Sequence, residues 1–290
     1  MTHRLGRLAS QLSSLSRPFS TTTTTTTAST STSTSLLSTA KMAASDIHLY
    51  TAQTPNGIKV SLLLEELGLQ YKTTAIDLSK NTQKEPWFLE INPNGRIPAL
   101  SDTHTDGSPI HLFESGAILL YLADRYDKNH KLSYPHGSRE YYEVNNWLFF
   151  QMAGLGPMQG QANHFLRYAA ETIQYGIDRY GNETRRLYRV LDTHLAKSTS
   201  GFLVGDRLTI ADIATWPWVA SHDWAGIDWS DMPHLQAWFH KILARPAIEK
   251  GRHIPSRHTA LDKRTPEEIE EFANAARAWV QKGMAEDSKK

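Results

Sequence analysis

Two short runs of this chain place together residue types that could bind a small peptide-like ligand. Residues 92–100 read NPNGRIPAL, and residues 113–121 read FESGAILLY. The first run combines a turn, an Ile-Pro bond and the start of a strand, while the second begins a helix on an acid and a hydroxyl. A short hairpin between the two runs is expected to bring them close together in space.

Each run offers groups that complement such a ligand. If the Ile97-Pro98 bond is cis, it would turn the backbone of Ile97 outward and leave its N–H and C=O free to pair with a peptide. Ser115 and the first amides of its helix would bind a carboxylate, because those N–H groups lack partners within the helix. Glu114 could bind an ammonium group. Glutathione carries all of these groups, and we therefore expect it to be the ligand.

Four stretches, in this order along the chain, resemble the glutathione transferase superfamily. They are TPNGIKVSLLLEELGLQY from Thr54, FESGAILLYLAD from Phe113, NWLFFQMAGLGPMQGQ from Asn146 and IADIATWPWV from Ile210. Within the superfamily, the chain looks most like the nu-class disulfide-bond oxidoreductases of bacteria and the transferase-like domain of the fungal nitrogen-regulator prion protein. The resemblance implies an α/β plus all-α architecture, with a thioredoxin-like domain followed by an all-helical domain.

The resemblance also implies roles for individual residues. Thr54 and Asn56, at the end of the first strand, would face the glutathione sulfur. A thiol of pKa about 8.5 is only a few per cent ionised at neutral pH, so one or two hydrogen bonds to the sulfur would raise the thiolate population. The rest of glutathione would be bound by residues at matching family positions: Gln83, Arg96, Ile97, Glu114, Ser115, Asn146 and Arg179.

Several of these residues have structural explanations as well. Thr54 and Asn56 could simply cap the following helix, and so could the Glu114-Ser115 pair at its own helix. Gln83 and Arg96 could be ordinary solvated loop side chains. Tyr50 could also donate to the thiolate, but a tyrosine within a strand is more often a packing residue, and we interpret it in that way.

The chain contains no cysteine, so it has neither a nucleophilic thiol nor a thiolate metal site of its own. The histidine spacing suggests no metal either. With this resemblance, we expect one bound glutathione thiolate to attack a small disulfide or a hydroperoxide, and a second glutathione to complete the reduction. Conjugation of glutathione to an electrophile is the close alternative. A non-catalytic regulatory module is a third possibility.

Charge and hydropathy exclude some classes of partner. Four of the 31 basic residues precede the first acidic residue, Asp46, which leaves 27 basic against 30 acidic residues beyond it. This balance predicts no nucleic-acid binding. No apolar run approaches the roughly 20 residues that span a bilayer, so we expect no membrane insertion. The aromatic run at residues 147–150 and the resemblance to dimeric transferases predict a homodimer.

Residues 1–45 have the composition of a mitochondrial transit peptide. Four leucines recur at helical spacing beside two arginines, without an acid, and residues 17–20 (RPFS) resemble a matrix-protease site. The Ser/Thr-rich stretch that follows is expected to be disordered. Translation from Met42 would instead leave a cytosolic form, and a disordered tail with chance arginines is the plain alternative.

The remaining pattern predicts a thioredoxin-like domain over 46–130, a helical domain over 137–255 and a partly helical extension over 256–290. Strands are expected at 47–51, 71–76, 98–100 and 110–112, and helices at 57–67, 86–89, 114–126, 139–152, 163–168, 182–197, 209–220, 234–243 and 266–284. Thr209 and Asp212 have the spacing of a capping box. Pro217, between two tryptophans, predicts a kinked and packed helix.

Overall fold

The computed structural model describes residues 46–288, and a four-stranded sheet organises the first part of them. The strands are β1 (His48–Thr51), β2 (Lys72–Ala75), β3 (Ala99–Thr103) and β4 (Pro109–Phe113), in the order β2-β1-β3-β4. β1 is parallel to β2 and antiparallel to β3, which pairs antiparallel with β4. Helix α1 (Gly57–Glu66) makes the crossover that a parallel pair requires. The predicted thioredoxin-like arrangement is confirmed.

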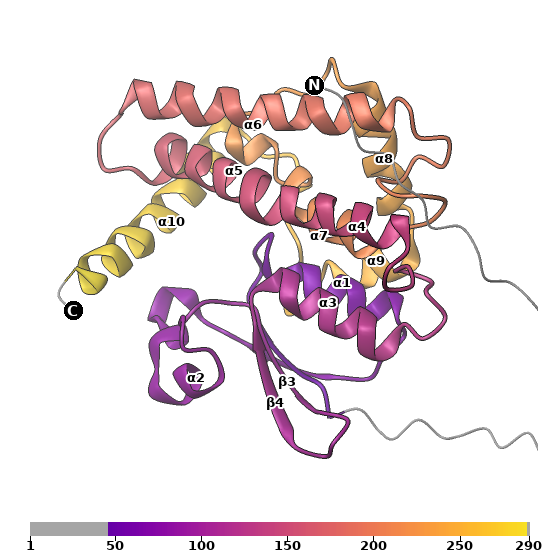
Figure 1. The fold of residues 1–290 in the computed structure, drawn as a ribbon. Helices are drawn as coiled ribbons and strands as arrows, with labels where there is room; N and C mark the ends of the chain where they lie inside the picture. The colour runs from indigo at the N-terminus through magenta and orange to yellow at the C-terminus, as the bar shows by residue number, and fades with distance from the viewer. Residues whose placement is uncertain (1–45, 289–290) are drawn as a thin grey trace, which may run out of the picture. The chain divides into compact units, whose positions relative to one another are not determined.

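The two faces of this sheet carry different helices. Helices α1 and α3 (Ser115–Tyr126) lie side by side between the sheet and the helical domain (Figure 1). Helix α2 (Pro86–Ile91) follows two short 3₁₀ turns, η1 (Leu78–Lys80) and η2 (Thr82–Lys84), and covers a small cluster that includes Phe88. The Tyr50 ring packs at this cluster, with its centroid 6.3 Å from that of Phe88. Tyr50 is therefore a packing residue, as the sequence predicts.

The helical domain follows a linker between Tyr126 and Arg139. Its elements are α4 (Arg139–Phe149), η3 (Phe150–Leu155), α5 (Gly156–Asn163), η4 (His164–Tyr168), α6 (Gln174–Leu195), α7 (Ile210–Val219), η5 (Asp223–Ala225), α8 (Pro233–Leu243) and α9 (Pro246–Gly251). Of these, η3 and η4 are π-helical and η5 is a 3₁₀ turn. The C-terminal extension forms α10 (Pro266–Asp287).

Two of the predicted helix boundaries are wrong. Residues 139–168 form one continuous helical run instead of two separate helices. Pro157 lies within this run, in the first turn of α5 and directly after a π-helical segment. Helix α6 begins at Gln174, eight residues before the predicted start. Gly176 lies in the early part of α6 that the prediction left out, and a Cβ there would lie 2.4 Å from Phe165, so close packing explains this glycine.

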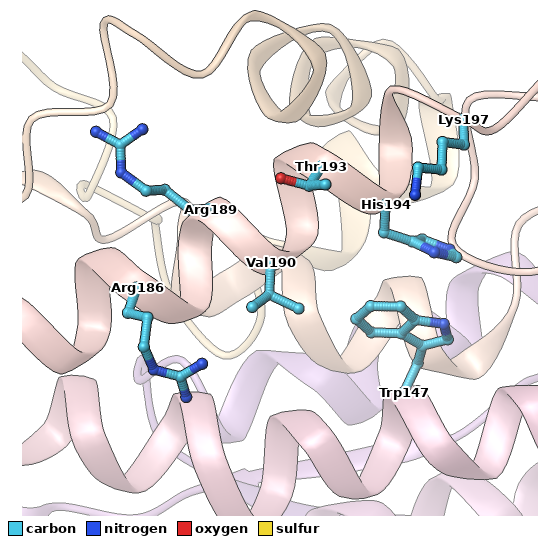
Figure 2. A pocket seen from close by; sticks show the side chains of 7 residues that line it. All are labelled: Trp147, Arg186, Arg189, Val190, Thr193, His194 and Lys197. Atoms are coloured by element: carbon cyan, nitrogen blue, oxygen red, sulfur yellow. The ribbon is translucent and has the colours of Figure 1, made fainter.

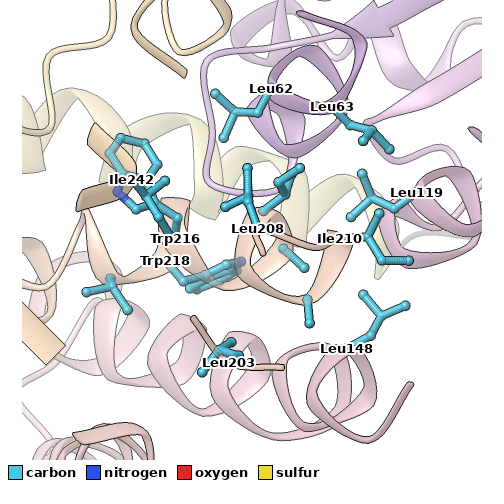
Figure 3. Packing of buried hydrophobic residues seen from close by; sticks show 14 of the residues in the cluster. Leu62, Leu63, Leu119, Leu148, Leu203, Leu208, Ile210, Trp216, Trp218 and Ile242 are labelled. Atoms are coloured by element: carbon cyan, nitrogen blue, oxygen red, sulfur yellow. The ribbon is translucent and has the colours of Figure 1, made fainter. Parts of the chain in front are cut away.

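The two domains share one hydrophobic core. Leu62 and Leu63 of α1 and Leu119 of α3 belong to the same buried cluster as Ile210 and Trp216 of α7 (Figure 3). All ten residues of α7 are buried, and the predicted capping box at its start is present. Because this continuous core spans the domain boundary, it holds the beginning of α1 at a defined position against α7.

The predicted transit peptide, residues 1–45, lies outside the described residues. Helix α10 confirms the predicted C-terminal helix and begins with a second capping box, formed by Thr265 and Glu268. It packs along η4, where Gln281 donates to the main-chain oxygen of Tyr168. Within residues 46–288, no helix is both long and apolar enough to cross a membrane.

Candidate functional site

The loop between β1 and α1 places Thr54 at the start of a helix. The Thr54 hydroxyl oxygen accepts a hydrogen bond of 3.0 Å from the backbone N–H of Gly57. Thr54 therefore does cap α1, as the structural alternative proposes. A hydroxyl that accepts one bond still has its own hydrogen to donate. The cap consequently leaves the Thr54 O–H available to a ligand sulfur, and the two roles are compatible.

Asn56 is oriented from the helical domain. The indole Nε1 of Trp218, on α7, donates a 3.0 Å hydrogen bond to the side-chain oxygen of Asn56. With the oxygen held, the Nδ2 end of the amide points away from the indole, and it has no partner elsewhere in the described chain. Asn56 makes no side-chain cap bond to α1. The structure thus presents an N–H donor at the beginning of α1, where the helix dipole also favours an anion.

The start of α3 carries the acid-hydroxyl pair. Glu114 is exposed and has a φ of 65°, an uncommon left-handed conformation for a residue with a side chain. Ser115 is only 3% exposed, and its hydroxyl contacts the Nζ of Lys59 at 3.2 Å and the sulfur of Met152 at 3.5 Å. The side chain of Glu114 makes no cap bond to α3. The alternative that the Glu114 side chain merely caps α3 is therefore not observed.

The loop before β3 contains the predicted cis bond and the main chain of Ile97. The Ile97-Pro98 bond is cis, as predicted. Neither the N–H nor the C=O of Ile97 makes a hydrogen bond to any described residue. Asn92 is buried and organises the loop by donating to the main-chain oxygen of Arg96 at 2.6 Å and accepting from the N–H of Asn94 at 2.9 Å. The Arg96 side chain is exposed.

Gln83 is buried rather than solvated. It lies in η2, and its Nε2 donates to the side-chain oxygen of Asn81 at 3.2 Å. Its own side-chain oxygen is buried and has no partner within residues 46–288. The main-chain oxygen of Gln83 lies so close to Gly95 that a Cβ there would be 3.0 Å away. Gln83 therefore packs against the loop that carries Arg96, with an acceptor that a ligand N–H would satisfy.

The structure does not join the remaining two predicted residues to these. Asn146 is exposed on α4, and Arg179 is exposed on α6. The described contact of the Arg179 side chain is with the ring of Tyr180, 6.0 Å from its centroid. No described interaction connects either residue to Thr54 or Ser115. Their roles stay predictions.

Sequence reasoning missed a buried lysine behind Ser115. Lys59 of α1 is fully buried, and its Nζ also donates to the side-chain oxygen of Gln151, on η3, at 2.6 Å. Burial lowers the pKa of Lys59 to about 7, while the negative charge of Glu114 acts in the opposite direction. A signal was present in the sequence, because Lys59 is the one charged residue among residues 57–64 of α1, all of which are buried. Trp218 was interpreted only as packing, and its bond to Asn56 was not foreseen.

A separate groove of about 500 Å³ lies between α4 and α6 (Figure 2). It is lined by Trp147, Arg186, Arg189, Val190, Thr193, His194 and Lys197. None of the predicted glutathione residues is among them. Its arginines already have acidic partners, since Arg186 pairs with Glu183 and Arg189 with Asp231. We therefore place the candidate site at the starts of α1 and α3 instead of in this groove.

Comparison with protein families places this geometry in context. The family model for the glutathione S-transferase N-terminal domain matches residues 45–124, and that for the C-terminal domain matches residues 177–246. The disulfide-bond oxidoreductase YfcG of Escherichia coli K12 is 47% identical over 204 residues, which cover 69% of this chain and 92% of the relative. The chain belongs to the glutathione transferase family. The candidate site lies mainly in its matched N-terminal domain.

Two further relatives indicate the branch of the family. The protein URE2 of Saccharomyces bayanus is 36% identical over 230 residues, covering 68% of this chain and 66% of that protein. A glutathione transferase homologue from Lodderomyces elongisporus, solved with two glutathione molecules per subunit, is 48% identical. The match covers 72% of this chain and 99% of that one, with a TM-score of 0.70. The resemblance to the disulfide-bond oxidoreductase and URE2 branch is confirmed.

Proposed function

We propose that this transferase-family protein binds glutathione and uses it to reduce small disulfides or hydroperoxides. The observation that carries the proposal is the pair of donors, the Thr54 hydroxyl and the oriented Asn56 amide, in a chain with no cysteine. Such donors stabilise a thiolate that must come from the ligand. The name of the bacterial relative and the two glutathione molecules in the fungal one support the same reaction.

The proposed reaction has two displacement steps. The thiolate of one bound glutathione attacks a disulfide sulfur, forming a mixed disulfide and releasing the other half of the substrate as a thiolate. The thiolate of a second glutathione then attacks the glutathione sulfur of the mixed disulfide, which yields glutathione disulfide and a second substrate thiol. The substrate gains two electrons and two protons, and two glutathione molecules supply them. In this scheme Thr54 and Asn56 lower the pKa of the first thiol.

The proposed binding mode uses the rest of the site. The ligand peptide would pair with the free N–H and C=O of Ile97, and the γ-glutamyl carboxylate would meet Ser115 and the first amides of α3. Glu114, exposed beside them, would bind the ammonium. Gln83 and Arg96 would bind nearer the glycyl end, where the buried oxygen of Gln83 would gain a donor.

A side-by-side assay tests the reaction. At equal glutathione concentration, the purified protein should reduce a small mixed disulfide faster than it conjugates a chlorinated nitroarene. Faster conjugation would move the protein to the electrophile-conjugating alternative. Glutathione binding without either activity would favour the regulatory module, and absence of binding would refute the proposed site.

We also infer that the protein forms a homodimer through α4. Tyr142 and Phe149 are 60% and 61% exposed, and their spacing of seven residues places them on one face of that helix. Trp147, by contrast, is directed against His194, with ring centroids 4.3 Å apart, so only part of the predicted aromatic run is available. A second copy of the chain would bury the exposed pair.

The composition of residues 1–45 supports a proposal of mitochondrial targeting, with a cytosolic form from Met42. Full-length protein with a C-terminal tag should enter mitochondria and lose its leader, whereas protein begun at Met42 should stay outside. N-terminal sequencing of the mature protein tests this. An intact leader on protein recovered outside mitochondria would refute the targeting proposal.

A further inference from the structure

Lys59 is the buried cation of the candidate site. It lies on α1 with 0% of its surface exposed, and its Nζ donates to the oxygens of Ser115 and Gln151 at 3.2 and 2.6 Å. A third contact, at 3.4 Å, is to the sulfur of Met152. A lysine is rarely buried to this degree without an acidic partner, because its charge loses hydration that neutral groups replace only in part.

No such partner is present in the described chain. The carboxylate that acts on Lys59 is that of Glu114, which is exposed, and no ion pair joins the two within residues 46–288. Other titratable groups on α1 and on the elements packed against it bond elsewhere, namely Glu65, Glu66, Tyr121, Asp124, Arg125, Tyr126, Asp212, Glu249, Lys250 and His48. Among residues 46–288, Lys59 is therefore a cationic group without a close counter-ion, bonded to the first residue of α3.

Ser115 connects this cation to the ligand position. A hydroxyl has one hydrogen to donate and two lone pairs. Ser115 accepts from Lys59, and its own hydrogen is directed at the sulfur of Met152, a weak acceptor, at 3.5 Å. A ligand carboxylate would be a far stronger acceptor for the same hydrogen. We propose that Lys59 is a positioning residue that orients the Ser115 hydroxyl toward the γ-glutamyl carboxylate of glutathione and supplies the positive charge behind it.

The proposal deepens the glutathione-binding site and rests on the proposed function. It adds a thermodynamic consequence, because a ligand carboxylate near Lys59 favours the ammonium form. In the free protein, burial lowers the pKa of Lys59 to about 7, so part of the population is neutral at that pH. Ligand binding would raise this pKa, and the protein would then take up a proton as it binds. Affinity should be highest below pH 7 and should fall as pH rises, by up to about tenfold per unit between the free and bound pKa values.

The test uses S-methylglutathione, which has no thiol to titrate, and the full-length protein. Calorimetric titrations between pH 6 and 8.5, in two buffers of different ionisation enthalpy, give the affinity and the number of protons taken up. The variants are Lys59→Met, Ser115→Ala and the double substitution. Lys72→Met, on the exposed side of β2, is the matched control because it removes the same charge away from the site.

We expect the unmodified protein to take up a fraction of a proton near pH 7.5. Lys59→Met should weaken binding at least tenfold at pH 6.5 and abolish the proton uptake, with Lys72→Met unchanged. The double variant should bind more weakly than Ser115→Ala but lose less than the product of the two single losses, because Lys59 acts partly through that hydroxyl and partly through its charge. Lys59→Met with affinity within twofold of the unmodified protein, or effects that simply add, would overturn the proposal.

Two outcomes distinguish a failure of the Lys59 proposal from a failure of the proposed glutathione-binding function. If Lys59→Met does not fold, the unmodified protein decides, since binding without proton uptake overturns the inference and uptake supports it. If the unmodified protein does not bind S-methylglutathione at all, the glutathione site itself is refuted.

Discussion

Replacing Trp218 by phenylalanine should raise the pKa of the thiol of bound glutathione, although in the proposed mode Trp218 acts on the ligand only through Asn56. The substitution removes the indole N–H that holds the Asn56 oxygen at 3.0 Å. The amide can then rotate and present its oxygen, which repels a thiolate, in place of its N–H groups. A hydrogen bond to a charged acceptor contributes about 1.5 to 3 kcal/mol, and 1.36 kcal/mol corresponds to about one pKa unit. Partial loss of the bond from Asn56 to the thiolate predicts a rise of about 0.5 to 1 unit in the thiol pKa.

The chain supplies a matched control on the same helix. Trp216 is also buried in α7, and its indole donates to the main-chain oxygen of Phe239 at 3.2 Å, away from the site. Trp216→Phe removes the same atoms and should lower stability without changing the thiol pKa. Direct removal of the donor, in Asn56→Ala, should raise the thiol pKa by about one to two units.

The measurement is the ultraviolet absorbance of the glutathione thiolate, titrated against pH with each variant in excess. The rate of disulfide reduction over the same range should show the same shift, because the thiolate is the attacking species. A thiol pKa that is equal in Trp218→Phe and the unmodified protein would refute the orienting role of Trp218. An equal shift in Trp216→Phe would assign the effect to general loosening of the core.

Three further outcomes are expected. Ser115→Ala should weaken glutathione binding by about ten- to a hundredfold, since a charge-assisted bond of about 1.5 to 3 kcal/mol is lost, and unchanged calorimetric affinity would remove Ser115 from the site. Tyr50→Phe should leave the rate of disulfide reduction within about twofold of that of the unmodified protein, because the ring packs beside Phe88. A large loss would instead support Tyr50 as a hydrogen-bond donor to the thiolate. Phe149→Asp should shift sedimentation from about twice the monomer mass to the monomer mass, whereas an unmodified protein already monomeric at micromolar concentration would refute the α4 interface.

Much of the fold was predictable because its signals are local. Alternation and helical spacing identified the strands and the crossover helix, and the predicted capping box at residue 209 involves groups only three positions apart. The predictions were wrong where local signals conflicted with packing. The helical run over residues 139–168 continues through Pro157, which follows a π-helical segment, and α6 begins early at Gln174, with Gly176 packed against Phe165.

In the candidate site, too, some residues were visible from local sequence and others depended on packing or on family resemblance. Glu114 and Ser115 were proposed because they lie at a helix start, where the orphan N–H groups and the residue types are visible in a few consecutive letters. Thr54 and Asn56 came from the family resemblance. The buried state of Gln83 was not visible, since its loop appeared solvated. Asn146 and Arg179 came from family resemblance alone, and no described contact tests them.

The sequence by itself determined which groups are available for a ligand: the NPNGRIPAL and FES runs, the polar residues after the first strand and the absence of cysteine. Only the tertiary structure decided how those groups are oriented and charged. The bond from Trp218 to Asn56 joins residues 162 positions apart, and that from Lys59 to Gln151 joins residues 92 positions apart. Periodicity shows that a helix face is buried but does not show which residue of another domain it meets. Which residues meet depends on how the shared core packs. This packing brings the Trp218 indole to Asn56 and the Lys59 side chain to Ser115.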